Sequence, residues 1–116
     1  MLHEEKKAAK IVEELTIFFF GIGGNEMSSS MKRDKDKVYI RFTSNYHHAF
    51  AHKIEVMEDY LNRPKNDGVE DIYWELAGSG DPGEASQLLL IGMMIDKAVI
   101  HKEEGSVTVE IEKTMG

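Results

Sequence analysis

The sequence predicts a single α/β domain, built as a two-layer α/β sandwich with its elements in the order αβαβαβ. The chain has 116 residues, which is the length of one ordinary domain. Three segments repeat apolar residues at helical spacing, and three others alternate apolar and polar residues as half-buried strands do. Strands buried on both faces would read as continuous apolar runs. We therefore expect residues 1–116 to form a small mixed sheet with helices on one face.

The first predicted helix spans residues 3–20. Its apolar residues recur three and four positions apart, whereas Glu4, Lys7 and Glu14 fall elsewhere on the helical wheel. Glycines at positions 21, 23 and 24 would end it. The segment Ile17–Phe20, taken alone, is equally compatible with a strand.

Residues 21–36 have the composition of a loop. They contain glycines, three consecutive serines and five consecutive charged residues of both signs, Lys32 to Asp36. This pattern predicts a flexible connection without regular structure.

A strand is predicted next, because Val38, Ile40 and Phe42 alternate with polar residues. A second helix follows over residues 46–61, with Ser44 or Asn45 as its N-cap. Its apolar stripe consists of Tyr46, Phe50, Ile54, Met57 and Leu61.

The second half of the chain predicts a strand over residues 72–76, a turn-rich loop over 78–83, a long helix over 84–103 and a strand over 107–112. The long helix is apolar around nearly its whole circumference, so it is either a buried core helix or part of an interface. Met93 and Met94 suit an irregular partner surface, because methionine side chains adapt to uneven neighbours. The second interpretation predicts a protein partner or a homodimer through the helix around Met93 and Met94.

The charge balance excludes several partners. Fourteen basic and 21 acidic residues give a net charge of −7, which disfavours nucleic-acid backbones and anionic membrane surfaces. The absence of cysteine excludes disulfides, thiolate metal sites and cysteine nucleophiles. No apolar run is long enough for a secretory signal or a membrane span, so we expect a cytoplasmic protein.

The predicted order of elements resembles the histidine-kinase-like ATPase fold of the GHKL superfamily. In one register, Glu13-Glu14-Leu15-Thr16-Ile17-Phe18 matches the family's first motif, and residues 92–109 match its last helix and the following strand. In a second register, residues 80–109 match the segment around that first motif, with Asp96-Lys97-Ala98 on its Asp-Asn-Ala.

Departures from the family pattern concern the nucleotide site. The resemblance places Phe18 in the first register, or Lys97 in the second, where the family has its magnesium-binding asparagine. The family's Asp-x-Gly-x-Gly motif is absent from this chain. Without a magnesium ligand the phosphates would lack a counter-charge. The resemblance therefore implies a degenerate scaffold that does not use ATP.

One metal site can be suggested from spacing. His48 and His52 are four residues apart in the predicted second helix, and Glu55 extends the same stripe. Two imidazoles and a carboxylate could hold zinc or another divalent metal. The alternative is a solvated polar face, because this stripe lies opposite the apolar one. No His-Glu-x-x-His motif is present, so the stripe carries no general base.

The sequence contains no strong catalytic motif, so no catalytic residue and no nucleotide cofactor is predicted. The first interpretation is a non-enzymatic regulatory or protein-interaction domain on a degenerate histidine-kinase-ATPase-like scaffold. The second is a metal- or small-ligand-binding domain that uses His48, His52 and Glu55. An enzyme of unrecognised type is the third.

Overall fold

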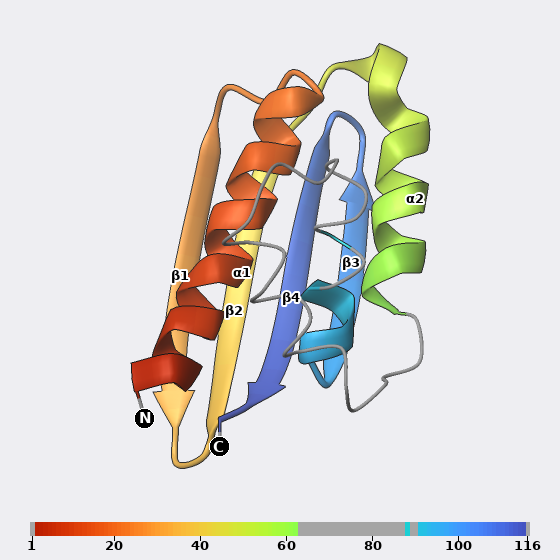
Figure 1. Ribbon diagram of the computed structural model, residues 1–116. Coiled ribbons are helices and arrows are strands. Elements are labelled where there is room, and N and C mark those ends of the chain that lie inside the picture. Colours follow the sequence, from red (N-terminus) through yellow and green to blue (C-terminus); the bar gives the residue numbers. More distant parts are fainter. Residues whose placement is uncertain (1, 63–87, 89–90, 116) are drawn as a thin grey trace, which may run out of the picture.

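The computed structural model describes residues 2–62, 88 and 91–115, shown in Figure 1. A long N-terminal helix precedes a β-hairpin, a short helical segment follows, and a second hairpin closes the described chain. The elements are α1 (Leu2–Gly21), β1 (Met27–Asp34), β2 (Lys37–Asn45), the 3-10 turn η1 (His48–Phe50), α2 (Ala51–Leu61), β3 (Lys97–Glu103) and β4 (Ser106–Thr114). Residues 91–94 form one further helical turn.

The four strands form one sheet in the order β1-β2-β4-β3, and every neighbouring pair is antiparallel. The molecule is therefore an α+β protein, and the predicted two-layer α/β sandwich with the order αβαβαβ and a mixed sheet is wrong. The reason lies in the connections. β1 joins β2, and β3 joins β4, through two-residue turns, which allow only antiparallel pairing, whereas parallel neighbours need a crossover of a dozen residues or more.

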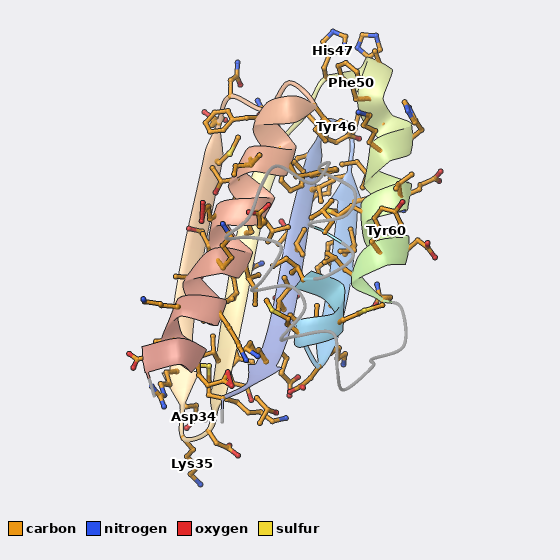
Figure 2. All side chains as sticks on the ribbon, viewed as in Figure 1. Asp34, Lys35, Tyr46, His47, Phe50 and Tyr60 are labelled. Atoms are coloured by element: carbon orange, nitrogen blue, oxygen red, sulfur yellow. The ribbon has the colours of Figure 1, made fainter. Side chains whose placement is uncertain are left out.

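Both turns use a residue with positive φ. Lys35 has a φ of 58° between β1 and β2, and Gly105 has a φ of 76° between β3 and β4. Such angles match the twist of the flanking strands in tight hairpins. Figure 2 shows Asp34 and Lys35 together at the tip of the first hairpin.

The predicted loop over residues 21–36 is wrong, because Met27–Asp34 is strand β1. Serines and alternating charges are poor strand formers by themselves. Each residue of β1 nevertheless lies opposite a residue of β2, from Met27 beside Ser44 to Asp34 beside Lys37. Pairing with a well-formed neighbour therefore overrides the local preference.

The predicted helix over residues 84–103 is wrong at its C-terminal end, because Lys97–Glu103 is strand β3. Val99 and Ile100 are β-branched and favour a strand once β4 offers a partner. Earlier in this segment the structure describes residues 88 and 91–96, of which 88 and 91–94 are helical. The predicted strand 72–76 and loop 78–83 lie outside the described residues.

Three sequence predictions are confirmed: the helix over 3–20 as α1, the strand from Val38 as β2, and the strand over 107–112 as β4. The helix predicted over 46–61 begins later, as η1 at His48, and becomes α-helical at Ala51. Neither predicted cap is used. His47 is the N-cap of η1, and its side chain accepts a hydrogen bond from the Ala49 amide.

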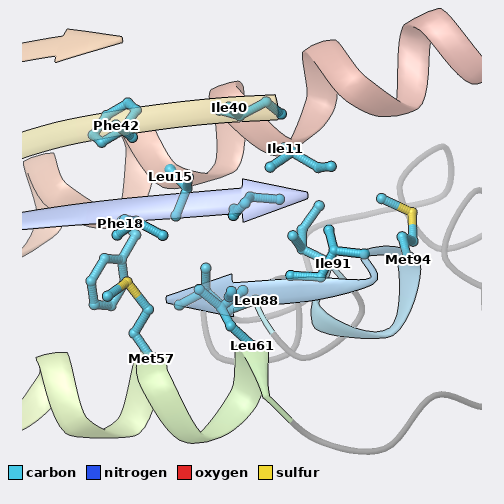
Figure 3. Close-up of a cluster of buried hydrophobic side chains, with 14 of the residues drawn as sticks. Ile11, Leu15, Phe18, Ile40, Phe42, Met57, Leu61, Leu88, Ile91 and Met94 are labelled. Carbon is cyan, nitrogen blue, oxygen red and sulfur yellow. The ribbon is translucent and has the colours of Figure 1, made fainter. Parts of the chain in front are cut away.

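The hydrophobic core lies between the helices and one face of the sheet, seen in Figure 3. β2 alternates between buried residues on this face and exposed residues on the other, and β4 does the same. α1 packs on β2, where Phe19 stacks on Phe42 with ring centroids 5.5 Å apart. α2 packs on β3. Figure 1 shows both helices in front of the same face.

A buried cluster of charges attaches the N-terminal end of α1 to the sheet. Lys113 of β4 is 2% exposed, and its Nζ donates to the Met94 carbonyl at 3.1 Å. Its Nζ also lies 3.7 Å from Glu4 Oε2, while Lys7 Nζ lies 3.5 Å from Glu4 Oε1. Buried charges are tolerated only when they are paired in this way, so the cluster fixes where α1 lies on the sheet.

Candidate functional site

Strand β1 is an edge of the sheet, and no other described strand pairs with its outer side. The Asn45 amide donates to the Glu26 carbonyl at 3.3 Å. Because backbone groups in an antiparallel strand point alternately to the two sides, the even-numbered residues of β1 point towards β2. The N–H and C=O groups of Met27, Ser29 and Met31 therefore point to the free edge.

A groove runs between this edge and α1. We call it the β1 groove, a cavity of about 320 Å³ lined by Thr16, Phe20, Asn25, Met27, Ser28, Ser29 and Phe42. Phe20 is 64% exposed, and Met31, further along β1, is 48% exposed. Two large apolar side chains in water beside an unpaired strand edge are typical of a protein-binding surface.

The end of the groove near the α1–β1 connection is held rigidly. The Asn45 side-chain oxygen accepts from the amides of Asn25 at 2.9 Å and Glu26 at 3.1 Å, while its Nδ2 donates to Asn25 Oδ1 at 2.7 Å. Asn45, which the sequence suggested as a helix cap, therefore holds the connection instead. The Gly24 amide also donates to the Phe19 carbonyl at 2.7 Å. These bonds fix the start of β1 relative to the end of α1, so the groove is preformed.

Sequence reasoning missed the β1 groove, because it treated residues 21–36 as a loop. A signal was present in the spacing of Met27, Ser29 and Met31, which lie on one face when the segment is extended. Phe20 gave a second signal, since it follows two buried phenylalanines and lies on the outer side of the helix.

The predicted metal ligands do not form a cluster. His48, His52 and Glu55 are all exposed, and the helix changes from 3-10 to α between the two histidines. The His48 ring stacks on His47 with centroids 4.5 Å apart, at the end of the molecule seen in Figure 2. Within residues 2–62, 88 and 91–115, no three His, Asp or Glu side chains are grouped to hold a metal. Zinc binding stays a prediction from spacing.

The segment around Met93 and Met94 offers little surface. Met94 is 2% exposed and belongs to the core, while Met93 is half-buried. Gly92 lies against the end of α2, where an added Cβ would be 2.1 Å from the Tyr60 carbonyl oxygen. A homodimer through this segment stays a prediction to which Met94 could not contribute.

The face of the sheet away from the helices is polar, with its charges paired across strands. Glu110 lies 2.7 Å from His101 Nε2 and 3.9 Å from Arg41 Nε. Lys37 donates to Glu112, and this hydrogen bond raises the pKa of Lys37 above its ordinary value. A shallow cavity of about 300 Å³ lies over the same strands. Cross-strand pairs of this kind keep an exposed sheet face solvated.

Phe18 is buried at 5% exposure, edge-on to Phe19 with ring centroids 5.2 Å apart. This is the residue that the family resemblance places at the magnesium-binding asparagine in one register. A buried phenyl ring supplies no oxygen ligand to a magnesium ion.

Comparisons with protein families, with characterised proteins and with solved structures find no match for this chain. None of the helices in the described part of the chain is long and apolar enough to cross a membrane.

Proposed function

We propose that this protein is a non-enzymatic protein-interaction domain that binds an extended segment at the free edge of β1. The observation that carries the proposal is a strand edge with which no described strand pairs, combined with the exposed Phe20 and Met31 beside it. In strand addition, backbone hydrogen bonds supply affinity, and alternate side chains of the added strand enter pockets next to the edge.

The β1 groove supports both parts of this recognition. Met27, Ser29 and Met31 offer backbone donors and acceptors in register, and the groove between them and Phe20 receives alternate side chains. Because Asn45 and Gly24 hold the connection in place, little ordering entropy is lost on binding. The other edge strand, β3, is less suited, because its end is tied to α2 by Lys102 and Glu58 at 2.8 Å.

The degenerate histidine-kinase-ATPase-like scaffold stays in the proposal as an expectation from the sequence resemblance. The burial of Phe18 supports the expectation that this protein does not bind a nucleotide together with magnesium. A regulatory role fits a domain that has a binding edge but carries no strong catalytic motif in its sequence.

The test uses a soluble peptide of alternating threonine and valine with a lysine at each end. NMR titration of the isotopically labelled protein should shift the amide signals of Met27, Ser29 and Met31 in a saturable way. The variant Ser29→Pro should abolish these shifts, because proline removes one edge donor and blocks close approach. A peptide of the same length with proline in place of valine is the control, because it lacks the backbone donors that strand addition needs. Unchanged edge amides at high peptide concentration, in a protein that sedimentation shows to be monomeric, would contradict the proposal.

A further inference from the structure

We infer that the strand added to β1 comes from a second copy of this chain, which makes a homodimer with a continuous eight-stranded sheet. This inference rests on the proposed function and names the partner of the same edge. It is carried by the alternation of β1 backbone groups, by the opposite charges of Glu26 and Lys32 on either side of Ser29, and by the apolar residues beside the edge.

The hydrogen-bond alternation determines how two copies can pair. Only odd-numbered residues of β1 direct backbone groups to the free edge. In an antiparallel β1–β1 pair, odd residues must therefore face odd residues. Residues directly opposite each other share a face of the sheet, so the two-fold axis is perpendicular to the sheet and both α1 helices lie on the same side.

Among the registers that satisfy this condition, only the one with its axis at Ser29 places Glu26 opposite a basic residue. With the axis at Ser29, Met27 faces Met31 of the second copy, and Glu26 faces its Lys32. By symmetry each of these pairs occurs twice. About six backbone hydrogen bonds then join the two β1 strands. An axis at Ser30 would instead place Glu26 against Asp34, and an axis at Ser28 would leave both charges without a partner.

The helices agree with the same register. α1 and β1 run in opposite directions in Figure 1, and Phe20 and Met27 line the same groove. With a rise of about 1.5 Å per helical and about 3.3 Å per strand residue, Thr16 is level with Ser29 and Val12 with Met31. A two-fold axis at Ser29 then brings Phe20 of one copy opposite the half-buried Val12 of the other. The exposed phenyl ring thereby gains an apolar partner.

Charge exchange between Glu26 and Lys32 tests the partner and the register together. Light scattering and sedimentation should show a dimer for the unmodified protein. Lys32→Glu or Glu26→Lys alone should weaken it roughly tenfold, because two attractive pairs become repulsive. The double variant Glu26→Lys/Lys32→Glu should restore the dimer. A mixture of the two single variants should form a heterodimer, since each then meets the opposite charge.

Cross-linking gives an independent measure of the axis position. The chain has no cysteine, so Ser29→Cys introduces a single thiol next to the axis. A short bismaleimide should link two copies of this variant. Asp34→Cys on the same strand is the control, because its two thiols would lie about 34 Å apart across the axis. Equal cross-linking of both variants would overturn the register.

The outcomes separate this inference from the proposed function. If the chain stays monomeric at high concentration while the threonine–valine peptide still binds β1, the second copy is overturned and strand addition stands. If neither occurs, both are overturned. A dimer that survives both Ser29→Pro and the single charge reversals overturns the β1 interface. Circular dichroism of each variant would check that the fold is retained.

Discussion

At the scale of single residues, Gly24 controls how closely α1 can approach the sheet. A Cβ at this position would lie 2.8 Å from the Phe19 carbonyl oxygen, 2.8 Å from Ser44 Oγ and 2.9 Å from the Asn45 carbonyl oxygen. Two of these three atoms belong to the backbone and cannot move without disturbing the connection. The glycine is therefore required for the close contact that shapes the β1 groove.

Gly24→Ala should lower the free energy of unfolding by about 2 kcal/mol, because the added methyl group overpacks this contact. Urea denaturation measures the change. Gly105→Asn is the matched control, since Gly105 has open space around it and a φ of 76° that asparagine tolerates. The control should change stability little, and an equal loss in both variants would argue against the steric explanation.

At the scale of elements, β1 has two sides with different sensitivity. Even-numbered residues donate to β2, whereas odd-numbered residues direct their amides away from it. Ser29 and Ser30 have the same side chain and are adjacent, so they form a matched pair for separating these sides.

Ser30→Pro should destabilise the protein by about 2 kcal/mol, because it removes a ladder hydrogen bond and its ring disturbs the pairing with Arg41. Ser29→Pro should cost less than about 1 kcal/mol, since proline is tolerated on the open side of an edge strand. Thermal and urea unfolding of both variants provide the comparison. The opposite order of stabilities would show that the alternation is reversed and would also remove the basis for the dimer register.

The contact between α2 and β3 includes an ion pair with a defined dependence on pH. Lys102 Nζ lies 2.8 Å from Glu58 Oε1, and this hydrogen bond raises the pKa of Lys102 above its ordinary value of 10.5. A lysine with a raised folded-state pKa stabilises the fold below 10.5, and the contribution is lost as pH rises through the higher value. Exposed pairs of this kind contribute roughly 0.2–1 kcal/mol.

Lys102→Met should therefore reduce stability at neutral pH, and the difference from the unmodified protein should shrink in strongly alkaline solution. Urea denaturation across this range, with low salt throughout, measures it. Lys97→Met on the same strand is the control, because Lys97 is exposed and makes no ion pair with a described residue. A difference that stays constant with pH would show that packing, rather than charge, links the two elements.

At the scale of the whole molecule, thermal stability tests whether this protein binds ATP or ADP. A ligand that binds only the native state must raise its apparent stability. We expect ATP or ADP with magnesium to leave the melting temperature unchanged, because Phe18 is buried in the core. Differential scanning fluorimetry with and without magnesium measures this. A clear upward shift with nucleotide would show that the scaffold keeps an ATP site.

Much of the fold followed from local sequence patterns. α1, β2 and β4 carry strong periodicity, because each places one apolar face against the core: Ile11 and Leu15, Ile40 and Phe42, Val109 and Ile111. An amphipathic period is a property of the segment itself, and it identifies the element without knowledge of its neighbours. Composition likewise determined the net charge of −7 and the absence of thiol chemistry.

The strand order, β1, β3 and the candidate site were decided only by the tertiary structure. β1 is polar and forms a strand because it pairs with β2. β3 lies in an apolar run that by itself predicts a helix, and it forms a strand because it pairs with β4. Strand pairing depends on residues distant in sequence, such as Ile40 and Ile111. A binding edge also depends on which strands do not pair with it. In the described sheet, β2, β4 and β3 all lie on one side of β1, and only this strand order identifies the other side of β1 as an edge.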